Sequence, residues 1–471
     1  MQNEHQKSGN AAGRAAQRYF TVWRWHFYAG VFVSPFLILL AATGLMMMLT
    51  ANIYGKEGDR LGVAVRETVQ PLSRQAQAAL DAVDKDHGAV VQYIAPRAAD
   101  KVAVFRVNDG SGKATMVAVD PYTAEAAAIY PREKSLYHLM DEIHSDMLIG
   151  TVGDYLLETA AALTVLLVVS GWWLWYQKQQ GLAKMLVSPF GSRRSWWRSL
   201  HGTAGTWISL MLLLFCLSGM AWAGIWGGRA VQAWSQFPAG KWGVEPNPVS
   251  AVPVHGDLNG GKTKEIPWVL ELTPLPQSGA VSGEGGIAPD TPVTLDTVDR
   301  FARENGFEGR YHLYFPKGET GVWTLNRDSM SYDSPSPTAD RTVHIDRYSG
   351  RVLADIRFSD YNAFGKFMAA SIAFHMGTMG WWSVVLNVLF CLSVIGMCVS
   401  GWIMWWRRRP SGAADLVPPA AAYSARPPKG LAAVLLLLAA LFPTAAAAII
   451  AVWLLDRLLL RHAPALAKYL K

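Results

Sequence analysis

Two apolar stretches of the sequence carry a histidine in the same local pattern. In WRWHFYAGVFVSPFLILLAATGLMMM, His26 precedes Gly44 by eighteen residues, and in WWRSLHGTAGTWISLMLLLFCLSGMAW, His201 precedes Gly219 by eighteen residues. In both stretches another glycine stands four residues after the histidine. Ionisable residues within a membrane are costly and usually face the interior of a helix bundle. The pattern therefore predicts two membrane helices that carry their histidines at the same depth.

Two more histidines, His144 and His375, stand at the opposite ends of two further apolar stretches. Imidazole is an axial ligand of haem iron, and the interior of a helical bundle can hold such a cofactor. We therefore expect two b-type haems, each held by two histidines: one by His26 and His201, the other by His144 and His375. Two protein ligands close the iron, so the expected chemistry is electron transfer rather than oxygen activation.

Other features of these stretches bear on the same hypothesis. Arg24 and Arg198 stand just before the first two histidines and would meet haem propionates. A lone histidine at a helix end is more often an interfacial residue, and His138 competes with His144 as a ligand. Small residues near the histidines would leave room for a flat macrocycle: Gly30, Gly205, Gly377 and Gly380.

The composition is that of a membrane protein. Hydrophobic residues make up 51% of the chain, charged residues only 17%, and there are 20 tryptophans. Stretches long enough to span a bilayer lie at 28–50, 150–176, 203–226, 380–406 and 431–455.

The net charge of +7 does not indicate nucleic-acid binding, because the basic residues gather in short loops beside the apolar stretches. The loop 177–199 contains five basic residues and no acid, and Arg407, Arg408 and Arg409 follow the fourth stretch. The positive-inside rule then places the N-terminus and both short loops in the cytoplasm. The two long segments between the stretches are expected outside.

The three cysteines all lie within apolar stretches, and the sequence contains no CxxC and no CxxCH. This argues against structural zinc, a dithiol redox motif and covalently attached c-type haem.

Each long external segment shows the same order of predicted elements. An amphipathic helix comes first, at 73–83 and at 295–306, and three short strands follow it. The third strand of each set ends in an Asp-x-Tyr-x-small turn, at Asp120 and at Asp346. Those aspartates are more simply turn residues than ion ligands. The strands are expected at 89–95, 101–107 and 114–120, and at 309–316, 321–327 and 341–347.

The predicted fold class is a polytopic α-helical membrane protein. It is a tandem repeat of membrane helix, external α+β domain and membrane helix, with a fifth C-terminal membrane helix added. The expected order is a cytoplasmic tail (1–24), a span (25–50), an external domain (51–137), a span (138–176), a basic loop (177–199), a span (200–226), an external domain with a Pro/Gly-rich insert at 236–292 (227–370), a span (371–406), a Pro/Ala linker (407–430), a span (431–460) and a tail (461–471).

The motifs WHFYAG, LHGTAG, SGWWLWY, FHMGTMG, SGWIMWW, VAVDPYTA and VHIDRYSG together resemble the PepSY-associated transmembrane family. The last two resemble the PepSY module that such proteins carry outside the membrane. The resemblance covers most of residues 20–406. The insert at 236–292 and the fifth helix depart from it.

The resemblance implies a function, because the family includes bacterial inner-membrane ferrisiderophore reductases with two haems. It implies an enzyme that reduces Fe(III) in a siderophore or similar chelate at the periplasmic face. By the same resemblance the haem ligands are His26, His201, His144 and His375. Electrons would come from a cytoplasmic donor or a membrane quinol, and lipid would surround the helices.

Two other functions stay open from sequence. The chain could be a non-catalytic, membrane-anchored PepSY protein that binds a partner or regulates a peptidase. It could also be an electron-transfer subunit that serves another periplasmic redox protein.

Overall fold

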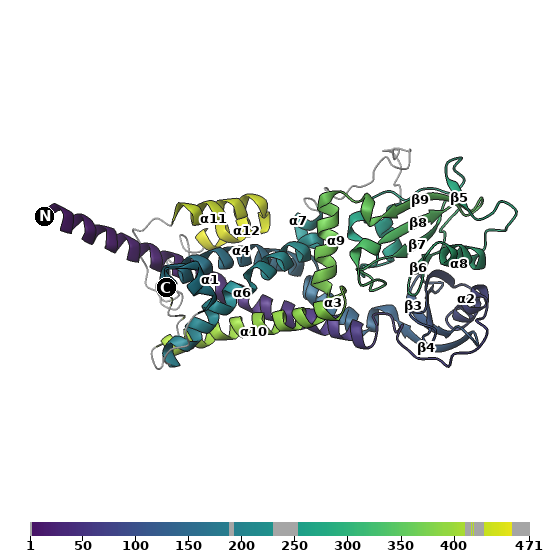
Figure 1. The fold of residues 1–471 in the computed structure, drawn as a ribbon, viewed down its shortest axis with the longest axis horizontal. Coiled ribbons are helices and arrows are strands. Elements are labelled where there is room, and N and C mark those ends of the chain that lie inside the picture. The colour runs from purple at the N-terminus through teal and green to yellow at the C-terminus, as the bar shows by residue number, and fades with distance from the viewer. Residues whose placement is uncertain are drawn as a thin grey trace. The chain divides into compact units, whose positions relative to one another are not determined.

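The computed structural model describes residues 2–187, 193–228, 253–409, 416, 418 and 428–454. By its internal contacts the chain forms two compact units (Figure 1). We call them the membrane unit, made of Met1–Thr43, Ile143–Val231 and Val388–Lys471, and the sheet unit, made of Gly44–Glu142 and Gln232–Asn387.

Four helices in the described part of the chain are long and apolar enough to cross a membrane. They agree with the four predicted stretches and make this a multi-pass membrane protein. α1 starts far ahead of the predicted span, because the Ala-, Gln- and Arg-rich residues before it favour helix. The four helices are α1 (Gln2–Ile53), α4 (Thr151–Gln179), α6 (Arg193–Gly219) and α10 (Trp381–Arg408).

The second and fourth spans start later than predicted. Two separate helices, α3 (Leu136–Asp146) and α9 (Ala363–Met376), occupy the predicted beginnings. The backbone takes positive φ at Leu148 and Gly150 after α3, and at Gly377 and Gly380 after α9. Glycine adopts this conformation without steric cost. Gly377 and Gly380 are thus explained by the backbone rather than by room for a macrocycle.

The C-terminal apolar stretch was expected to be one helix over 431–460, and the structure breaks it in two. α11 (Lys429–Leu441) and α12 (Pro443–Leu454) meet at a bend of 115°. Proline has no backbone N–H to donate into a preceding turn, so Pro443 ends one helix and begins the next. The predicted tail at 461–471 lies outside the described residues.

The described strands of the sheet unit form one antiparallel sheet in the order β4-β3-β2-β1-β6-β7-β8-β9-β5 (Figure 1). Two four-stranded meanders, β1–β4 and β6–β9, join where β1 pairs with β6. The two predicted external domains therefore share one sheet. Strands β4, β5 and β9 were not predicted. The strands are β1 (Ala89–Ile94), β2 (Ala103–Asn108), β3 (Ala114–Asp120), β4 (Glu125–Pro131), β5 (Glu284–Gly286), β6 (His312–Tyr314), β7 (Trp323–Arg327), β8 (Arg341–Ile345) and β9 (Arg351–Arg357).

The two predicted amphipathic helices are present as α2 (Leu72–Asp81) and α8 (Leu295–Glu304). Their apolar sides pack with strands of both meanders in a single hydrophobic core. After β3 and after β8 the chain makes the same turn. Asp120 Oδ1 accepts the N–H of Tyr122 at 2.8 Å, and Asp346 Oδ1 accepts the N–H of Tyr348 at 2.8 Å. Both aspartates are thus engaged as turn residues.

Buried ion pairs tie separate segments of the sheet unit together around Arg310, whose side chain is 1% exposed. Its guanidinium lies 2.5 Å from Glu57 Oε2 and 3.0 Å from Asp59 Oδ2, and it also pairs with Asp333. Burial alone would lower the pKa of Arg310, but these carboxylates raise it. The guanidinium is therefore charged, and its loss would leave buried carboxylates without their partner.

We predict that Arg310→Met lowers the free energy of opening of strands β6–β8 by about 3–5 kcal/mol, because one side of a buried ion-pair network is removed. Hydrogen exchange of the purified full-length protein measures this quantity. Arg357→Met is the matched control: Arg357 is 55% exposed and pairs with Asp355 at 3.0 Å, so its loss should cost less than about 1 kcal/mol. Equal effects of the two substitutions would contradict this account of the network.

Candidate functional site

His26 of α1 is held by a hydroxyl of α4. Its Nδ1 lies 3.0 Å from Ser170 Oγ, which itself donates to the carbonyl of Leu166 at 2.6 Å. Since the serine hydrogen is used in that bond, the hydroxyl oxygen accepts and His26 Nδ1 carries the proton. The next residue of α4 is Gly171, where a Cβ would lie 3.0 Å from the imidazole Cε1. A side chain there would push against the ring.

His201 of α6 is held by α10 in the matching way. Its Nδ1 lies 3.0 Å from Ser400 Oγ and 3.1 Å from the carbonyl oxygen of Met397. A carbonyl can only accept, so Nδ1 must donate. Gly401 follows, and a Cβ there would lie 3.5 Å from the imidazole Cε1. The lone pair of each imidazole is therefore on Nε2, the nitrogen that is free to bind a metal.

The two imidazoles stand close together within the membrane unit. The ring centroids of His26 and His201 are 6.3 Å apart, and the ring planes are nearly perpendicular, at 88°. Two imidazoles that bind one metal ion from opposite sides, each through a bond of about 2 Å, have their ring centres roughly 6 Å apart. The separation and the protonated Nδ1 atoms both fit a pair of axial haem ligands.

Two tryptophans complete a closed ring of contacts among the four long helices. Trp172 Nε1 of α4 donates to Ser209 Oγ of α6 at 3.0 Å, and Trp402 Nε1 of α10 donates to Ser34 Oγ of α1 at 2.8 Å. Each serine stands eight residues after the histidine of its own helix. The four helices are thus joined in the cyclic order α1, α4, α6, α10, with two matched sets of polar contacts.

The glycines after the histidines differ from the two that follow α9. A Cβ on Gly30 would meet one described atom within 4 Å, a Leu167 methyl carbon at 3.8 Å, and a Cβ on Gly205 would meet the sulfur of Met397 at 3.4 Å. A Cβ at either glycine would thus make van der Waals contact with a neighbouring helix, so both glycines allow close helix packing beside the histidines.

Arg24 and Arg198, the predicted partners of the haem propionates, lie in different surroundings. Arg24 donates to the Tyr28 hydroxyl at 3.2 Å and stacks over its ring, while Arg198 is exposed. A third basic residue, Arg408, lies over the rings of Trp23 and Phe27. The structure thus places cationic side chains on the same helices as His26 and His201.

His144 repeats the arrangement of the first two histidines. On α3, its Nδ1 lies 2.9 Å from Thr43 Oγ1, which donates to the carbonyl of Leu39 at 2.8 Å. Its Nδ1 therefore donates to the hydroxyl. His375 lies on α9 in the sheet unit, so its pairing with His144 stays a prediction. The rival His138 lies in a different setting, 3.4 Å from Thr263 Oγ1 and 3.8 Å from Glu142 Oε1.

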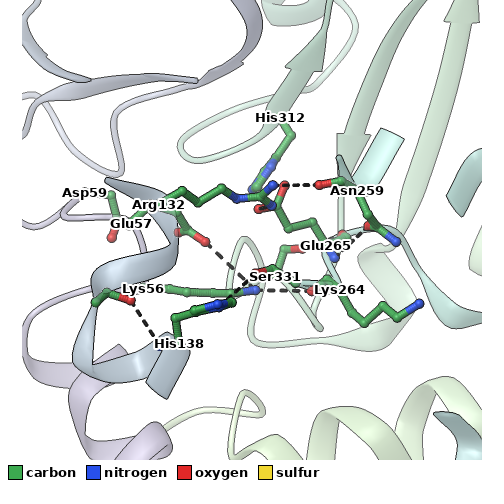
Figure 2. Close-up of polar contacts among 12 residues, drawn as sticks. Lys56, Glu57, Asp59, Arg132, His138, Asn259, Lys264, Glu265, His312 and Ser331 are labelled. Carbon is green, nitrogen blue, oxygen red and sulfur yellow. Dashed lines mark hydrogen bonds and ion pairs between the residues drawn. The ribbon is translucent and has the colours of Figure 1, made fainter. Parts of the chain in front are cut away.

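The sheet unit contains a second polar site, shown in Figure 2. It surrounds a cavity of about 20 Å³, the size of a water molecule. Burial raises the pKa of Glu57, whereas Arg132 and Arg106 overcome the effect of burial and hold the pKa of Glu265 low. The hydroxyl of Tyr130 has no hydrogen-bond partner among the described residues. The cavity is lined by Lys56, Glu57, Met116, Tyr130, Arg132, Ser135, Tyr137, His138, Thr263 and Glu265.

The sequence-based hypothesis missed the hydroxyls that orient the imidazoles. Ser170 and Ser400 stand in the matched motifs SGWWLWY and SGWIMWW, whose tryptophans are typical of an aromatic belt at the membrane interface. The repeated Ser-Gly before each belt was the available signal. A serine in a membrane helix has few partners other than its own backbone or a neighbouring helix.

The chain matches a known protein family. The model of the family described as "PepSY-associated TM region" matches residues 23–408, which include most of α1, the other three long helices and the described strands of the sheet unit. No curated protein matches the sequence.

We predict that Ser170→Ala weakens haem binding by the chain about 10- to 100-fold, because the ring orientation and basicity of a metal-binding histidine depend on the group that accepts its other N–H. Haem titration followed by absorption measures the affinity. Ser393→Ala is the matched control, since Ser393 of α10 donates only to the Leu389 carbonyl of its own helix among described contacts. If the two variants bind haem equally well, Ser170 does not orient a ligand.

Proposed function

Because the chain belongs to the family of the PepSY-associated TM region, we propose that it is a haem-dependent transmembrane electron-transfer protein that reduces Fe(III) in siderophores or related chelates and releases Fe(II). The His26–His201 pair is the observation that supports this proposal most strongly. Its ring separation of 6.3 Å suits a shared metal, and both Nδ1 atoms donate to neighbouring helices.

Residues of the membrane unit would hold one haem: His26 and His201 would bind its iron, and Arg24 and Arg198 would pair with its propionates. A haem with two histidine ligands supplies one-electron transfer. The hydrogen bonds of Ser170 and Ser400 orient the two imidazoles. Preorganised surroundings need little rearrangement when charge moves, which favours electron transfer over ligand exchange.

We further propose that the chain is a tandem duplication in the inner membrane of a bacterium. The first copy would comprise α1 to α4 with the meander β1–β4, and the second α6 to α10 with β6–β9. The basic loops would lie in the cytoplasm, and the sheet unit in the periplasm. A second haem at His144 and His375 would continue the electron path toward that side.

The chemistry of iron explains why one electron is sufficient for release. Fe(III) is a hard cation that binds oxygen ligands strongly, and Fe(II) binds them less well. The electron would come from a cytoplasmic donor or a membrane quinol, and the chelate would lose its metal after accepting it. The same electron path could serve another redox protein instead, or the membrane helices could merely anchor a partner-binding sheet unit.

We predict that His26→Ala or His201→Ala removes one haem and abolishes electron transfer across the membrane, because either substitution deletes an axial ligand. The assay uses proteoliposomes with a reductant inside and a ferric hydroxamate chelate outside, and detects Fe(II) with a coloured chelator. His87→Ala is the control, since the His87 side chain is 80% exposed and distant in sequence from every proposed ligand.

Three results would contradict the proposal. Unchanged haem content in both variants would refute the ligand assignment. A colourless wild-type protein, purified after haem supply, would favour the anchored partner-binding protein. Haem with trans-membrane electron transfer but no activity on ferric chelates would favour the subunit of another redox system.

A further inference from the structure

One segment of the sheet unit, which we call the cap segment (residues 253–275), covers the sheet face opposite to α2 and α8. Val343 and Ile345 of β8 belong to the core beneath those helices, so His344 between them points to the other face. The cap segment closes on itself there. His255 N–H donates to the Thr273 carbonyl at 3.0 Å, and Gly256 N–H donates to the Glu271 carbonyl at 2.9 Å.

The base of the cap segment is fastened to the sheet by two histidines. His255 Nε2 and His344 Nε2 lie 2.8 Å apart, and both side chains are 0% exposed. His255 Nδ1 lies 2.8 Å from the carbonyl oxygen of Thr273, which can only accept. His255 therefore carries its proton on Nδ1, and its Nε2 accepts.

The tautomer of His255 also determines the tautomer of His344. Because His255 Nε2 accepts, His344 must donate from its own Nε2, and its Nδ1 then accepts from the Thr324 hydroxyl at 2.9 Å. Every nitrogen of the pair is satisfied only while both rings are neutral. A second proton on His255 would put two N–H groups face to face across 2.8 Å.

The tip of the cap segment is fastened by bonds that mild acid does not break. Glu265 pairs with Arg132 and lies 3.8 Å from Arg106. The two guanidinium groups outweigh burial and lower the pKa of Glu265. The same tip supplies Thr263 and Glu265 to the lining of the polar cavity in Figure 2.

We propose that the His255–His344 pair is a proton-sensitive catch, which holds the base of the cap segment on the sheet at neutral pH and releases it in mild acid while the Glu265 end stays attached. Release would loosen the wall of the polar cavity and give solvent access to it. The device needs no ligand and depends on no assumption about the haem sites.

The direction of the pH effect follows from the histidines. Burial lowers the pKa of His255 to about 4, and burial together with the neighbouring His255 lowers the pKa of His344. In the open state each ring regains an ordinary pKa near 6.5. The open state thus binds more protons, so the closed state is fully favoured above about pH 6.5 and loses stability as pH falls toward about 4.

Other charged groups on the packed elements do not produce this effect. Burial raises the pKa of Asp328, after β7, to about 6, so its protonation in mild acid favours the folded state instead. The remaining charges on the cap segment, β8 and β9 are engaged in ion pairs, hydrogen bonds or turns: Lys262 with Glu142, Lys264 with Glu271, Asp355 with Arg341 and Arg357, Arg351 with the Val281 carbonyl, Asp257 with the Val254 N–H, and Asp346 with the N–H groups of Tyr348 and Ser349.

Hydrogen exchange of the full-length protein in detergent, between about pH 7 and pH 5 and corrected for the intrinsic exchange rate, tests the catch at the amides of His255 and Gly256. In the wild-type protein we expect the protection factor to fall by up to about tenfold per pH unit for each histidine that gains a proton on opening. Protection that stays constant over this range would overturn the proposal.

Two variants distinguish protonation of the His255–His344 pair from protonation of other groups in the protein. His344→Gln keeps a donor toward His255 but cannot titrate, and His255→Asn keeps a donor toward the Thr273 carbonyl. Each should reduce the pH dependence to about one proton, a tenfold fall per unit in place of a hundredfold. The exposed control His87→Gln should leave it unchanged. A variant with the wild-type slope would show that other groups sense the acid.

Discussion

The membrane unit depends on one type of contact, a hydroxyl on one helix that accepts the Nδ1–H of a histidine on another. Ser170 does this for His26, Ser400 for His201 and Thr43 for His144. In each case the hydroxyl hydrogen is used within its own helix. The histidine is left with a single tautomer, and in a bilayer a buried polar group has few other partners. The same contact therefore packs the helices, and at His26 and His201 it leaves the lone pair on Nε2.

The sheet unit is held together by other interactions, which differ between its two faces. Its apolar core lies on one face, beneath α2 and α8. The opposite face is held by buried charges and by the His255–His344 pair. Arg310, Glu57 and Asp59 join the segment after α1 to the second meander, and Glu265 joins the cap segment to the first. Buried ion pairs add little net stability but penalise every arrangement that separates them, so they fix how the segments meet.

The sequence predicted those parts of the fold that have a strong local signal. The four long helices follow from apolar length, and α2, α8 and the matched turns at Asp120 and Asp346 follow from short patterns. Three features had no such signal. The pairing of β1 with β6 is a long-range contact, which the periodicity of the sequence does not indicate. The helix breaks at Leu148 and Gly377 depend on backbone conformation. The Ala-rich residues of β4 lack the alternation of a half-buried strand.

The sequence pointed to the proposed ligands of the candidate site but not to the groups that orient them. His26 and His201 were singled out because the pattern around them repeats. Ser170, Ser400, Trp172 and Trp402 were not, because a serine or tryptophan in a membrane helix has several ordinary roles. The catch in the cap segment was beyond sequence reasoning altogether, since His255 and His344 are 89 residues apart.

Electron paramagnetic resonance of the oxidised, haem-loaded protein tests the central claim most directly. Nearly perpendicular imidazole planes, 88° apart at His26 and His201, leave the two iron d orbitals of π symmetry almost equal in energy. We predict a low-spin ferric signal with one large, strongly shifted g value that is lost in His26→Ala. A high-spin signal, a rhombic signal typical of parallel imidazoles, or no haem signal at all would contradict a haem bound between these two rings.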